Sequence, residues 1–451
     1  MTRVLVTIGP ASEDPETISK LSSKTSLFRL NGSHNSVIWH RDVVKKIREI
    51  APNAFILLDI PGAKPRTANA EKINITEGEL VIFGAFDEVT QHKVVSLTKP
   101  LPTTNLDTSK QFSVNDGQYL FDITECGRDY VMGRSRRSFD LLPKKGLNIP
   151  GSVYDNQLQL EICREFLATA QDLDVDGYGL SFIQNSDILK AIKELAPDKV
   201  LVSKIENTEG LANAQDIIIN SDCVMIDRGD LAAEIGFERL FNAVEEITIS
   251  TKKYGRPLIM ATENLESMLA RDTPSKSEVM SLAHALAIGT DCIMLSEETA
   301  TAKNAFYIFS WLQKFLRNIQ INVHDHDTII ESGRYQAIWK LIKDEVDIPV
   351  LLMSKSGYAL YNFMALRPQK GVTVVTDNPK IEKVAKLFSA HIKVISTSLD
   401  ERVPIETIQD VIAKNKNTVF RENDHIAAVY VSKYVRNPRA NSVSLFHRDD
   451  F

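Results

Sequence analysis

Short apolar runs recur through the first 320 residues and alternate with stretches of helical periodicity, such as residues 36–50, 188–196 and 237–254. Strands that are apolar on both faces and alternate with helices belong to a parallel sheet that is covered on both sides. Eight such runs favour a closed (βα)8 barrel, the TIM barrel, over an open sheet. The runs lie at residues 3–9, 26–30, 54–60, 177–183, 199–205, 223–229, 257–262 and 291–296.

One connection in this pattern is far longer than the others. Between the third and fourth strands, residues 73–145 read as short β segments separated by turn residues. They predict a small β-barrel domain inserted into a barrel loop, with residues 143–151 as the return hinge. Because barrel active sites lie at the carboxyl ends of the strands, the inserted domain would act as a lid.

The alternating pattern restarts after about residue 326 and predicts a doubly wound α/β domain. Its expected strands lie at residues 348–354, 371–376, 392–397 and 425–432. The predicted domains are therefore a catalytic barrel of residues 1–68 and 146–325, a lid of residues 69–145, and a C-terminal α/β domain of residues 326–451.

Composition and charge narrow the class of protein. The net charge is −6, so no overall basic character recommends a nucleic-acid partner. No apolar run reaches about 18 residues, and no signal-peptide pattern precedes the first strand, which predicts no membrane partner and a cytoplasmic location. The four cysteines lack CxxC spacing, and Cys223 and Cys292 lie in apolar strands, where buried thiols are expected.

Charged and hydroxyl side chains follow several of the predicted strands. Lys204 and Glu206 are two residues apart at one strand end and project to the same side, and Asp230 follows the next strand. Neighbouring strands lie about 5 Å apart, so the two carboxylates could share Mg²⁺, and Lys204 could neutralise a phosphoryl group in transfer. A purely structural salt bridge among the three residues is the alternative.

A second polar group follows the second and third strands. Arg29 offers forked donors that suit phosphate. Asn31 and Ser33, with Asp59 from the neighbouring strand, could bind a monovalent cation or a water molecule. Alternatively, Asn31 and Ser33 could cap the helix over residues 36–50 and bind no ligand.

Hydroxyl groups and an arginine mark the remaining strand ends. Thr262 and Ser296 could relay a proton or hold water, although threonine is also an ordinary strand residue. Arg228 could bind phosphate, or it could pair with a carboxylate at the barrel mouth.

Taken in order, the strand-end stretches resemble the signature stretches of the pyruvate kinase family over nearly the whole chain. SKIENTEG together with RGDL is the most specific part. The resemblance implies the barrel, the lid after its third strand, the C-terminal domain and a homotetramer. It also implies phosphoryl transfer from phosphoenolpyruvate to ADP with Mg²⁺ or Mn²⁺. The matching stretches are FRLNGSH, LDIPGAKPRT, VNDG, KKGLNIPG, SKIENTEG, DRGDLAAEI, ATENLESM and CIMLSEETA.

The resemblance further implies roles for single residues. Lys204 and Arg29 would act on the transferring phosphoryl group, and Glu206 and Asp230 would bind the divalent metal. The N–H of Gly229 would bind the carboxylate of phosphoenolpyruvate. Thr262 would lie near the enolate carbon, with Ser296 in its proton relay. The nucleotide side chains would be Arg29, Asn31, His34, Arg66 and Lys145. The monovalent-cation site, or its replacement, would comprise Asn31, Ser33, Asp59 and Lys64.

One departure from the family pattern concerns potassium. Many members carry Thr-Lys-Gly-Pro-Glu after the aspartate, whereas this chain has IPGAK, ending at Lys64. Lysine in place of that glutamate is similar to potassium-independent members. An ammonium group beside Asp59 could take the charge role of K⁺. The hypothesis is therefore that activity requires Mg²⁺ but not K⁺.

Further departures leave other functions open. Asp227 stands where the family usually has Ala, and its charge could weaken phosphoenolpyruvate binding unless Arg228 pairs with it. The other departures are Gln184, Glu263, Asn264 and Glu297. One alternative function is a 2-oxo-acid lyase that uses a metal enolate on the same barrel. Another is a catalytically weak relative that binds a phosphometabolite. Retention of Arg66, Lys145 and the lid favours the kinase over the lyase.

Overall fold

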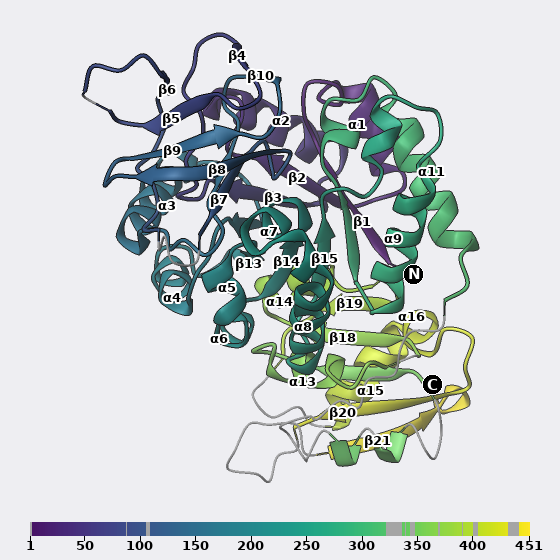
Figure 1. Ribbon diagram of the computed structural model, residues 1–451. Coiled ribbons are helices and arrows are strands. Elements are labelled where there is room, and N and C mark those ends of the chain that lie inside the picture. Colours follow the sequence, from purple (N-terminus) through teal and green to yellow (C-terminus); the bar gives the residue numbers. More distant parts are fainter. Residues whose placement is uncertain are drawn as a thin grey trace.

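The computed structural model comprises a barrel, an inserted β domain and a C-terminal α/β domain (Figure 1). It describes residues 2–451 except 87, 105–108, 322–335, 339, 343–347, 369, 390, 400–404 and 432–441. The predicted boundary between the barrel and the C-terminal domain, near residue 325, lies outside the described residues.

Eight parallel strands close into a barrel in the order β1-β16-β15-β14-β13-β12-β3-β2, which confirms the predicted TIM barrel. The barrel closes between β1 and β16, where Val6 pairs with Leu295. Almost every strand residue is buried, because one face fills the interior and the other meets the helices. The strands are β1 (Arg3–Thr7), β2 (Leu27–Asn31), β3 (Phe55–Ile60), β12 (Gly177–Leu180), β13 (Val200–Ile205), β14 (Cys223–Asp227), β15 (Leu258–Ala261) and β16 (Cys292–Leu295).

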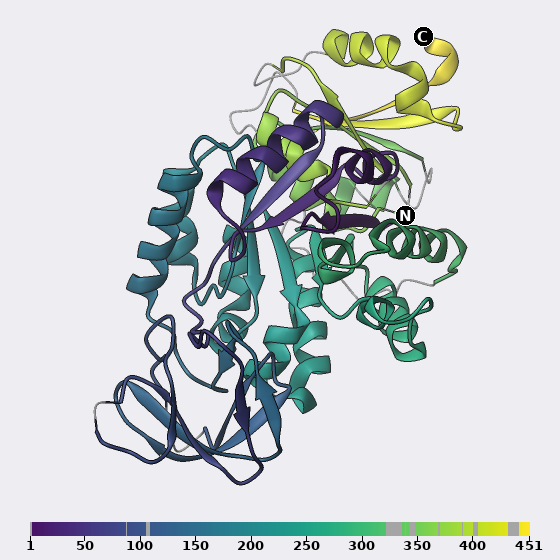
Figure 2. The same cartoon turned by 90° about the horizontal axis from the view of Figure 1, so that it is seen from above.

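Helices surround the barrel strands (Figure 2). In α2 (Val37–Ile50), Ser36 caps the first turn by accepting from the N–H of Trp39, and Val43 and Ile47 lie on the buried face. The other helical elements are α1 (Pro15–Ser22), α3 (Asn156–Ala170), α4 (Ser186–Leu195), α5 (Thr208–Ala212), α6 (Ala214–Asn220), α7 (Arg228–Ile235), η1 (Phe237–Arg239), α8 (Leu240–Lys253), η2 (Glu266–Leu269), α9 (Lys276–Ala287), α10 (Glu297–Ala300) and α11 (Ala305–Asn318).

The inserted β domain has a core of its own, with the Phe83 ring edge-on to the rings of Phe112 and Phe121. Its described strands form a six-stranded sheet, β11-β7-β8-β9-β5-β6, and a two-stranded sheet, β10-β4, rather than one closed barrel. Figures 1 and 2 place it away from the C-terminal domain. The strands are β4 (Ile73–Ile75), β5 (Leu80–Gly84), β6 (Lys93–Val95), β7 (Gln111–Val114), β8 (Tyr119–Cys126), β9 (Tyr130–Ser135), β10 (Phe139–Leu141) and β11 (Leu147–Asn148).

The C-terminal domain has a five-stranded sheet in the order β19-β18-β17-β20-β21. The four predicted strands are present and parallel, and β21 adds an antiparallel edge that the sequence analysis missed. The strands are β17 (Val350–Met353), β18 (Val372–Thr376), β19 (Ile392–Ser396), β20 (His425–Tyr430) and β21 (Ser442–His447). The helical elements are α13 (Tyr358–Met364), α14 (Pro379–Ala385), α15 (Ile405–Lys414), α16 (Lys416–Phe420) and η3 (Arg448–Asp450).

The C-terminal domain packs against the amino ends of the barrel strands. Asp222, just before β14, accepts a hydrogen bond from the N–H of Leu201 at 2.9 Å and pairs with Lys380 of α14 at 2.7 Å. The Arg256 guanidinium lies over the ring of Tyr361 from α13, 3.6 Å from its centroid. The carboxyl ends of the strands therefore remain clear of this domain. Among the described residues, no helix combines the length and apolar character needed to cross a bilayer.

Candidate active site

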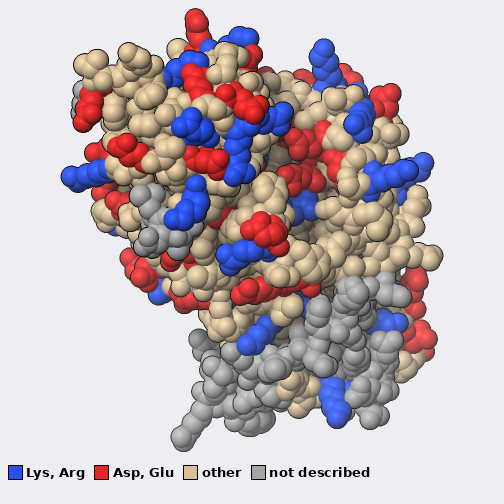
Figure 3. All heavy atoms as spheres, in the orientation of Figure 1, with Lys and Arg blue, Asp and Glu red and all other residues tan. Residues whose placement is uncertain are grey.

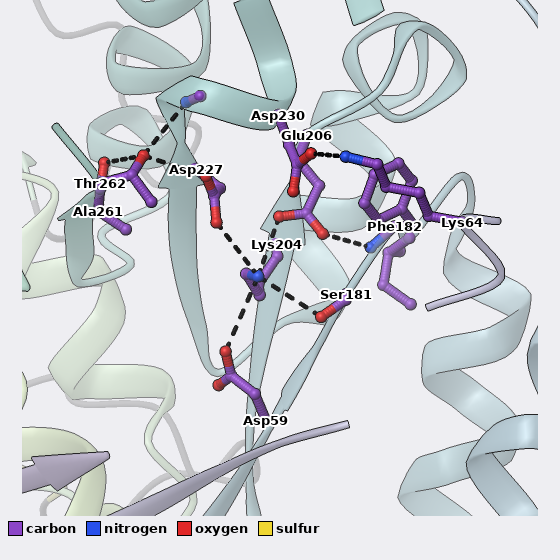
Figure 4. A network of polar contacts seen from close by, with 12 residues as sticks. Asp59, Lys64, Ser181, Phe182, Lys204, Glu206, Asp227, Asp230, Ala261 and Thr262 are labelled. Atoms are coloured by element: carbon purple, nitrogen blue, oxygen red, sulfur yellow. Dashed lines mark hydrogen bonds and ion pairs between the residues drawn. The ribbon is translucent and has the colours of Figure 1, made fainter. Parts of the chain in front are cut away.

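Charged side chains from several strand ends meet at the carboxyl face of the barrel (Figure 4). At their centre, Lys204 Nζ lies 3.1 Å from Glu206, 3.3 Å from Asp227 and 3.8 Å from Asp59. The Ser181 hydroxyl is 3.5 Å from the same ammonium. Burial by itself lowers the pKa of Lys204, but the carboxylates outweigh burial, so the pKa is raised and the ammonium is retained.

Glu206 is fully buried beside this ammonium. Its Oε1 accepts a hydrogen bond from the N–H of Phe182 at 2.8 Å, while Oε2 lies 3.1 Å from Lys204 Nζ and has no other hydrogen-bond donor among the described residues. Burial, with further contributions from Asp227 and Asp230, raises the pKa of Glu206 to about 8, although Lys204 opposes the shift. One oxygen each of Glu206, Asp227 and Asp230 lies within 4.8 Å of the others. This group of oxygens suits a divalent cation.

Lys64 occupies a different place from the one expected beside Asp59. Its ammonium pairs with Asp230 and lies 3.1 Å from Asp116 of the inserted domain. Burial lowers its pKa, but Asp230 and Asp116 outweigh burial and raise it. Arg29 instead pairs with Asp59. The expectation was therefore wrong, because Lys64 follows the end of β3 by four residues and its side chain turns toward these two carboxylates.

Asp59 is packed with little spare room. Arg29 Nη2 approaches Asp59 Oδ2 to 2.7 Å, and both side chains are almost fully buried. A Cβ at Gly179 of β12 would lie 2.1 Å from Asp59 Oδ1, so only glycine fits there without displacing the carboxylate. This close packing fixes the Arg29–Asp59 pair between neighbouring strands.

Thr262 lies directly after β15 in a conformation that is rare for a β-branched residue, with φ of 57°. Its hydroxyl lies 3.0 Å from Asp227 Oδ1 and accepts from the N–H of Gly229 at 3.2 Å. Arg228 holds the turn by donating to the carbonyl of Thr262 and to the side chain of Asn264 at 3.0 Å. The cation paired with Asp227 is Lys204, not Arg228 as the sequence analysis considered.

The polar residues after β2 form a small turn. Asn31 Oδ1 accepts from the N–H of Ser33 at 3.1 Å. Ser36 caps α2, so the alternative in which Asn31 and Ser33 cap this helix is wrong. His34 lies near Arg66: burial first, and then Arg66 and other cations, lower the pKa of His34.

The remaining predicted cations lie where the inserted domain joins the barrel. Arg66 pairs with Gly146 through an isolated antiparallel bridge, which places Arg66 beside Lys145. The Arg66 guanidinium donates to the Lys144 carbonyl at 3.2 Å, and the N–H of Lys145 donates to the Thr67 hydroxyl at 3.0 Å. Both residues therefore lie at this junction, and the charge of Arg66 is close enough to His34 to lower the pKa of that histidine.

The family departures Gln184, Glu263 and Glu297 have different surroundings in the structure. Gln184 accepts from the N–H of Tyr154 and donates to its carbonyl, which ties the segment that follows the return hinge to the barrel. Glu263 and Glu297 lie near Glu266. Burial raises the pKa of Glu266, and the charges of Glu263, Glu297 and Glu298 raise it further. These glutamates form an acidic rim. Figure 3 shows acidic groups gathered in a hollow on this face, next to a group of Lys and Arg side chains.

Ser296, Asp116 and Ser181 also belong to the site. Ser296 Oγ is buried and has no hydrogen-bond partner among the described residues. Asp116 and Ser181 contact the site lysines but were missed from the sequence. Asp116 belongs to the matched stretch VNDG, which was the available signal, whereas nothing local distinguishes Ser181.

Residues 1–306 match the family model described as the pyruvate kinase barrel domain. The probable cytosolic pyruvate kinase of Arabidopsis thaliana is 31% identical over 66% of this chain and 63% of its own length. The cytosolic pyruvate kinase of Nicotiana tabacum is 30% identical over 66% of this chain and 62% of its own. The chain thus spans less than two thirds of these two relatives.

Other relatives are matched over more of their length. Pyruvate kinase of Bacillus licheniformis is 28% identical over 94% of this chain and 77% of its own. A crystal structure of pyruvate kinase from Pyrobaculum aerophilum has the same fold, with a TM-score of 0.80 and 20% identity over 99% of this chain and 98% of that one.

Proposed function

Because the chain belongs to the pyruvate kinase family, we propose that it transfers the phosphoryl group of phosphoenolpyruvate to ADP and gives pyruvate and ATP. The observation that carries this proposal is the position of Lys204 Nζ, 3.1 Å from Glu206 and 3.3 Å from Asp227 at the barrel mouth. A fixed ammonium beside carboxylates that can hold a metal supplies the positive charge that phosphoryl transfer requires.

Phosphoryl transfer breaks the bond between phosphorus and the enol oxygen and forms a bond to a β-phosphate oxygen of ADP. Lys204 and Arg29 would neutralise the phosphoryl oxygens during this step. The N–H of Gly229 would bind the substrate carboxylate. The Thr262 hydroxyl, 3.0 Å from Asp227, would hold the proton that the enolate carbon then accepts, and Ser296 would support this relay.

Glu206 and Asp230 would hold Mg²⁺ or Mn²⁺. The fit rests on their carboxylate chemistry and on the grouping of their oxygens within 4.8 Å of each other. When bound, the ion would neutralise charge on phosphate oxygens. Asp230 and Thr262 would also border the substrate together with Lys204.

ADP would enter from the side of the inserted domain. Arg66 and Lys145 are held next to each other at its junction with the barrel. Their charges would bind nucleotide phosphates, with His34, Asn31 and Arg29 on the facing barrel turn. A lyase acting on 2-oxo acids would need neither Arg66 nor Lys145, so this group favours the kinase.

Activity without K⁺ remains part of the proposal, in a modified form. The residues that would form the monovalent-cation site, or replace it, are Asn31, Ser33, Asp59 and Lys64. The charge of Asp59 is compensated by Arg29 at 2.7 Å and by Lys204 at 3.8 Å. Lys64 adds a permanent cation at Asp230 instead. A site supplied with three fixed cations would therefore function without a monovalent ion.

We also propose the domain boundaries, the assembly and the cellular location that the sequence predicted. Residues 1–68 and 146–325 would be the catalytic domain, residues 69–145 the lid, and residues 326–451 the C-terminal domain. The chain would assemble into a homotetramer in the cytoplasm, where free thiols such as those of its cysteines are common. Light scattering on the purified protein would test the assembly.

The experiment that tests the proposed function measures pyruvate formation from phosphoenolpyruvate and ADP with Mg²⁺. The wild type should turn over, and Lys204→Met should lose about 10²–10³-fold in kcat. Lys190→Met is the matched control, because Lys190 pairs with Asp187 on the surface, away from the site. No turnover by the folded wild type would contradict the proposal, and cleavage of a 2-oxo acid would then favour the lyase.

A further inference from the structure

Asp227 lies close to the two carboxylates proposed to hold the metal. It is the last residue of β14 and pairs in register with Ala261 of β15. Its Oδ2 lies 3.3 Å from Lys204 Nζ, and its Oδ1 lies 3.0 Å from the Thr262 hydroxyl. One of its oxygens lies within 4.8 Å of oxygens from both Glu206 and Asp230.

With all three carboxyl groups ionised, the charges of this group do not balance. Glu206, Asp227 and Asp230 contribute three negative charges when ionised, and Lys204 and Lys64 contribute two positive charges through their ion pairs. Burying an uncompensated charge is costly unless another cation or further hydrogen bonds offset it. The buried Glu206 Oε2, whose partner is Lys204 Nζ at 3.1 Å, lies within this group.

We propose that Asp227 is a third carboxylate ligand of the divalent cation, in addition to Glu206 and Asp230. This inference rests on the proposed function in so far as that function places the cation here. Hard divalent cations bind carboxylate oxygens, and their affinity rises with the charge of the ligand set. Lys64, paired with Asp230, offsets the charge that Asp227 adds. The third carboxylate would tighten binding of the cation in the absence of a substrate phosphate.

Mn²⁺ binding without substrates tests this inference. Electron paramagnetic resonance would measure the free Mn²⁺ in titrations of the wild type, Asp227→Asn and Asp116→Asn. Asp116 is the matched control, because it also contacts Lys64 but lies outside the three-carboxylate group. Asp227→Asn should raise the Kd at least about tenfold, equivalent to about 1.4 kcal/mol, whereas Asp116→Asn should change it less than about threefold.

A second measurement needs no variant. Each carboxylate that binds removes one water from an octahedral ion, so pulsed resonance on wild-type protein with Mn²⁺ should count about three bound waters rather than about four. A count of four, an unchanged Kd in folded Asp227→Asn, or no Mn²⁺ binding at millimolar concentration would each overturn the inference. These readouts do not use turnover, so failure of the proposed kinase reaction is distinguishable from failure of the metal inference.

Discussion

Arg29 and Asp59 form a buried ion pair at the barrel mouth, with Nη2 and Oδ2 2.7 Å apart. The pair joins the ends of β2 and β3, which are neighbours in the barrel. Breaking a buried pair leaves an uncompensated charge, so loss of Arg29 would destabilise the barrel mouth. The same pair removes the need for Lys64 at Asp59 and frees that lysine for Asp230.

Potassium should have little effect on the rate of pyruvate formation. Replacing tetramethylammonium chloride by KCl at fixed ionic strength should change the wild-type rate by less than about twofold, because Arg29 and Lys204 already compensate Asp59. Lys64→Glu should become dependent on K⁺, since it reverses a fixed charge in the site. A several-fold stimulation of the wild type by KCl would contradict this prediction.

The Thr262 hydroxyl should be required for protonation of the enolate. Thr262→Ala should lower kcat by about 10²-fold or more, because general acid catalysis contributes at least that much. Thr262→Ser keeps the hydroxyl that lies 3.0 Å from Asp227 and should retain most of the rate. Steady-state assays of both variants check this; equal rates for the two would show that the hydroxyl is dispensable.

Glu234 should make stability depend on pH. Burial raises its pKa to about 7, while hydrogen bonds from Tyr154 and Asn148 oppose that shift. A carboxyl whose pKa is higher in the folded state favours folding at low pH. That contribution is lost as pH rises from the unfolded value near 4.5 through about 7.

The variant Glu234→Gln removes this titration. The Tm of this variant relative to wild type should therefore rise between pH 5 and pH 8. Over that range the difference in free energy of unfolding between the two proteins should change by at most about 3 kcal/mol. Differential scanning calorimetry at several pH values measures the difference in Tm. A difference that stays constant over this range would show that the pKa of Glu234 is not raised in the folded state.

Asp222 should contribute to stability rather than to chemistry. Asp222→Ala leaves the N–H of Leu201 and the ammonium of Lys380 without this carboxylate. The variant should therefore lower the free energy of unfolding by up to about 3–5 kcal/mol. Asp187→Ala is the control, because Asp187 pairs with Lys190 on the surface and should cost less than about 1 kcal/mol. Thermal denaturation compares the two, and equal Tm values would contradict the prediction.

Much of the fold could be predicted because its signals are local. The barrel strands are buried on both faces and therefore read as continuous apolar runs, and Ser36 gives α2 a recognisable start. The strand β21 was missed because it is an antiparallel edge, where Leu445 is exposed and Phe446 is buried. Its pairing with β20 depends on a partner that precedes it in the chain and cannot be read from its own residues.

The sequence by itself determined which residues could carry chemistry, since Lys204 and Glu206 stand two residues apart at a strand end. Only the tertiary structure decided which charges meet. Lys64 pairs with Asp230 and Asp116, which are 166 and 52 residues away along the chain. The physical reason is that an ion pair depends on distance in space and on burial, and both are set by barrel closure and by the position of the inserted domain.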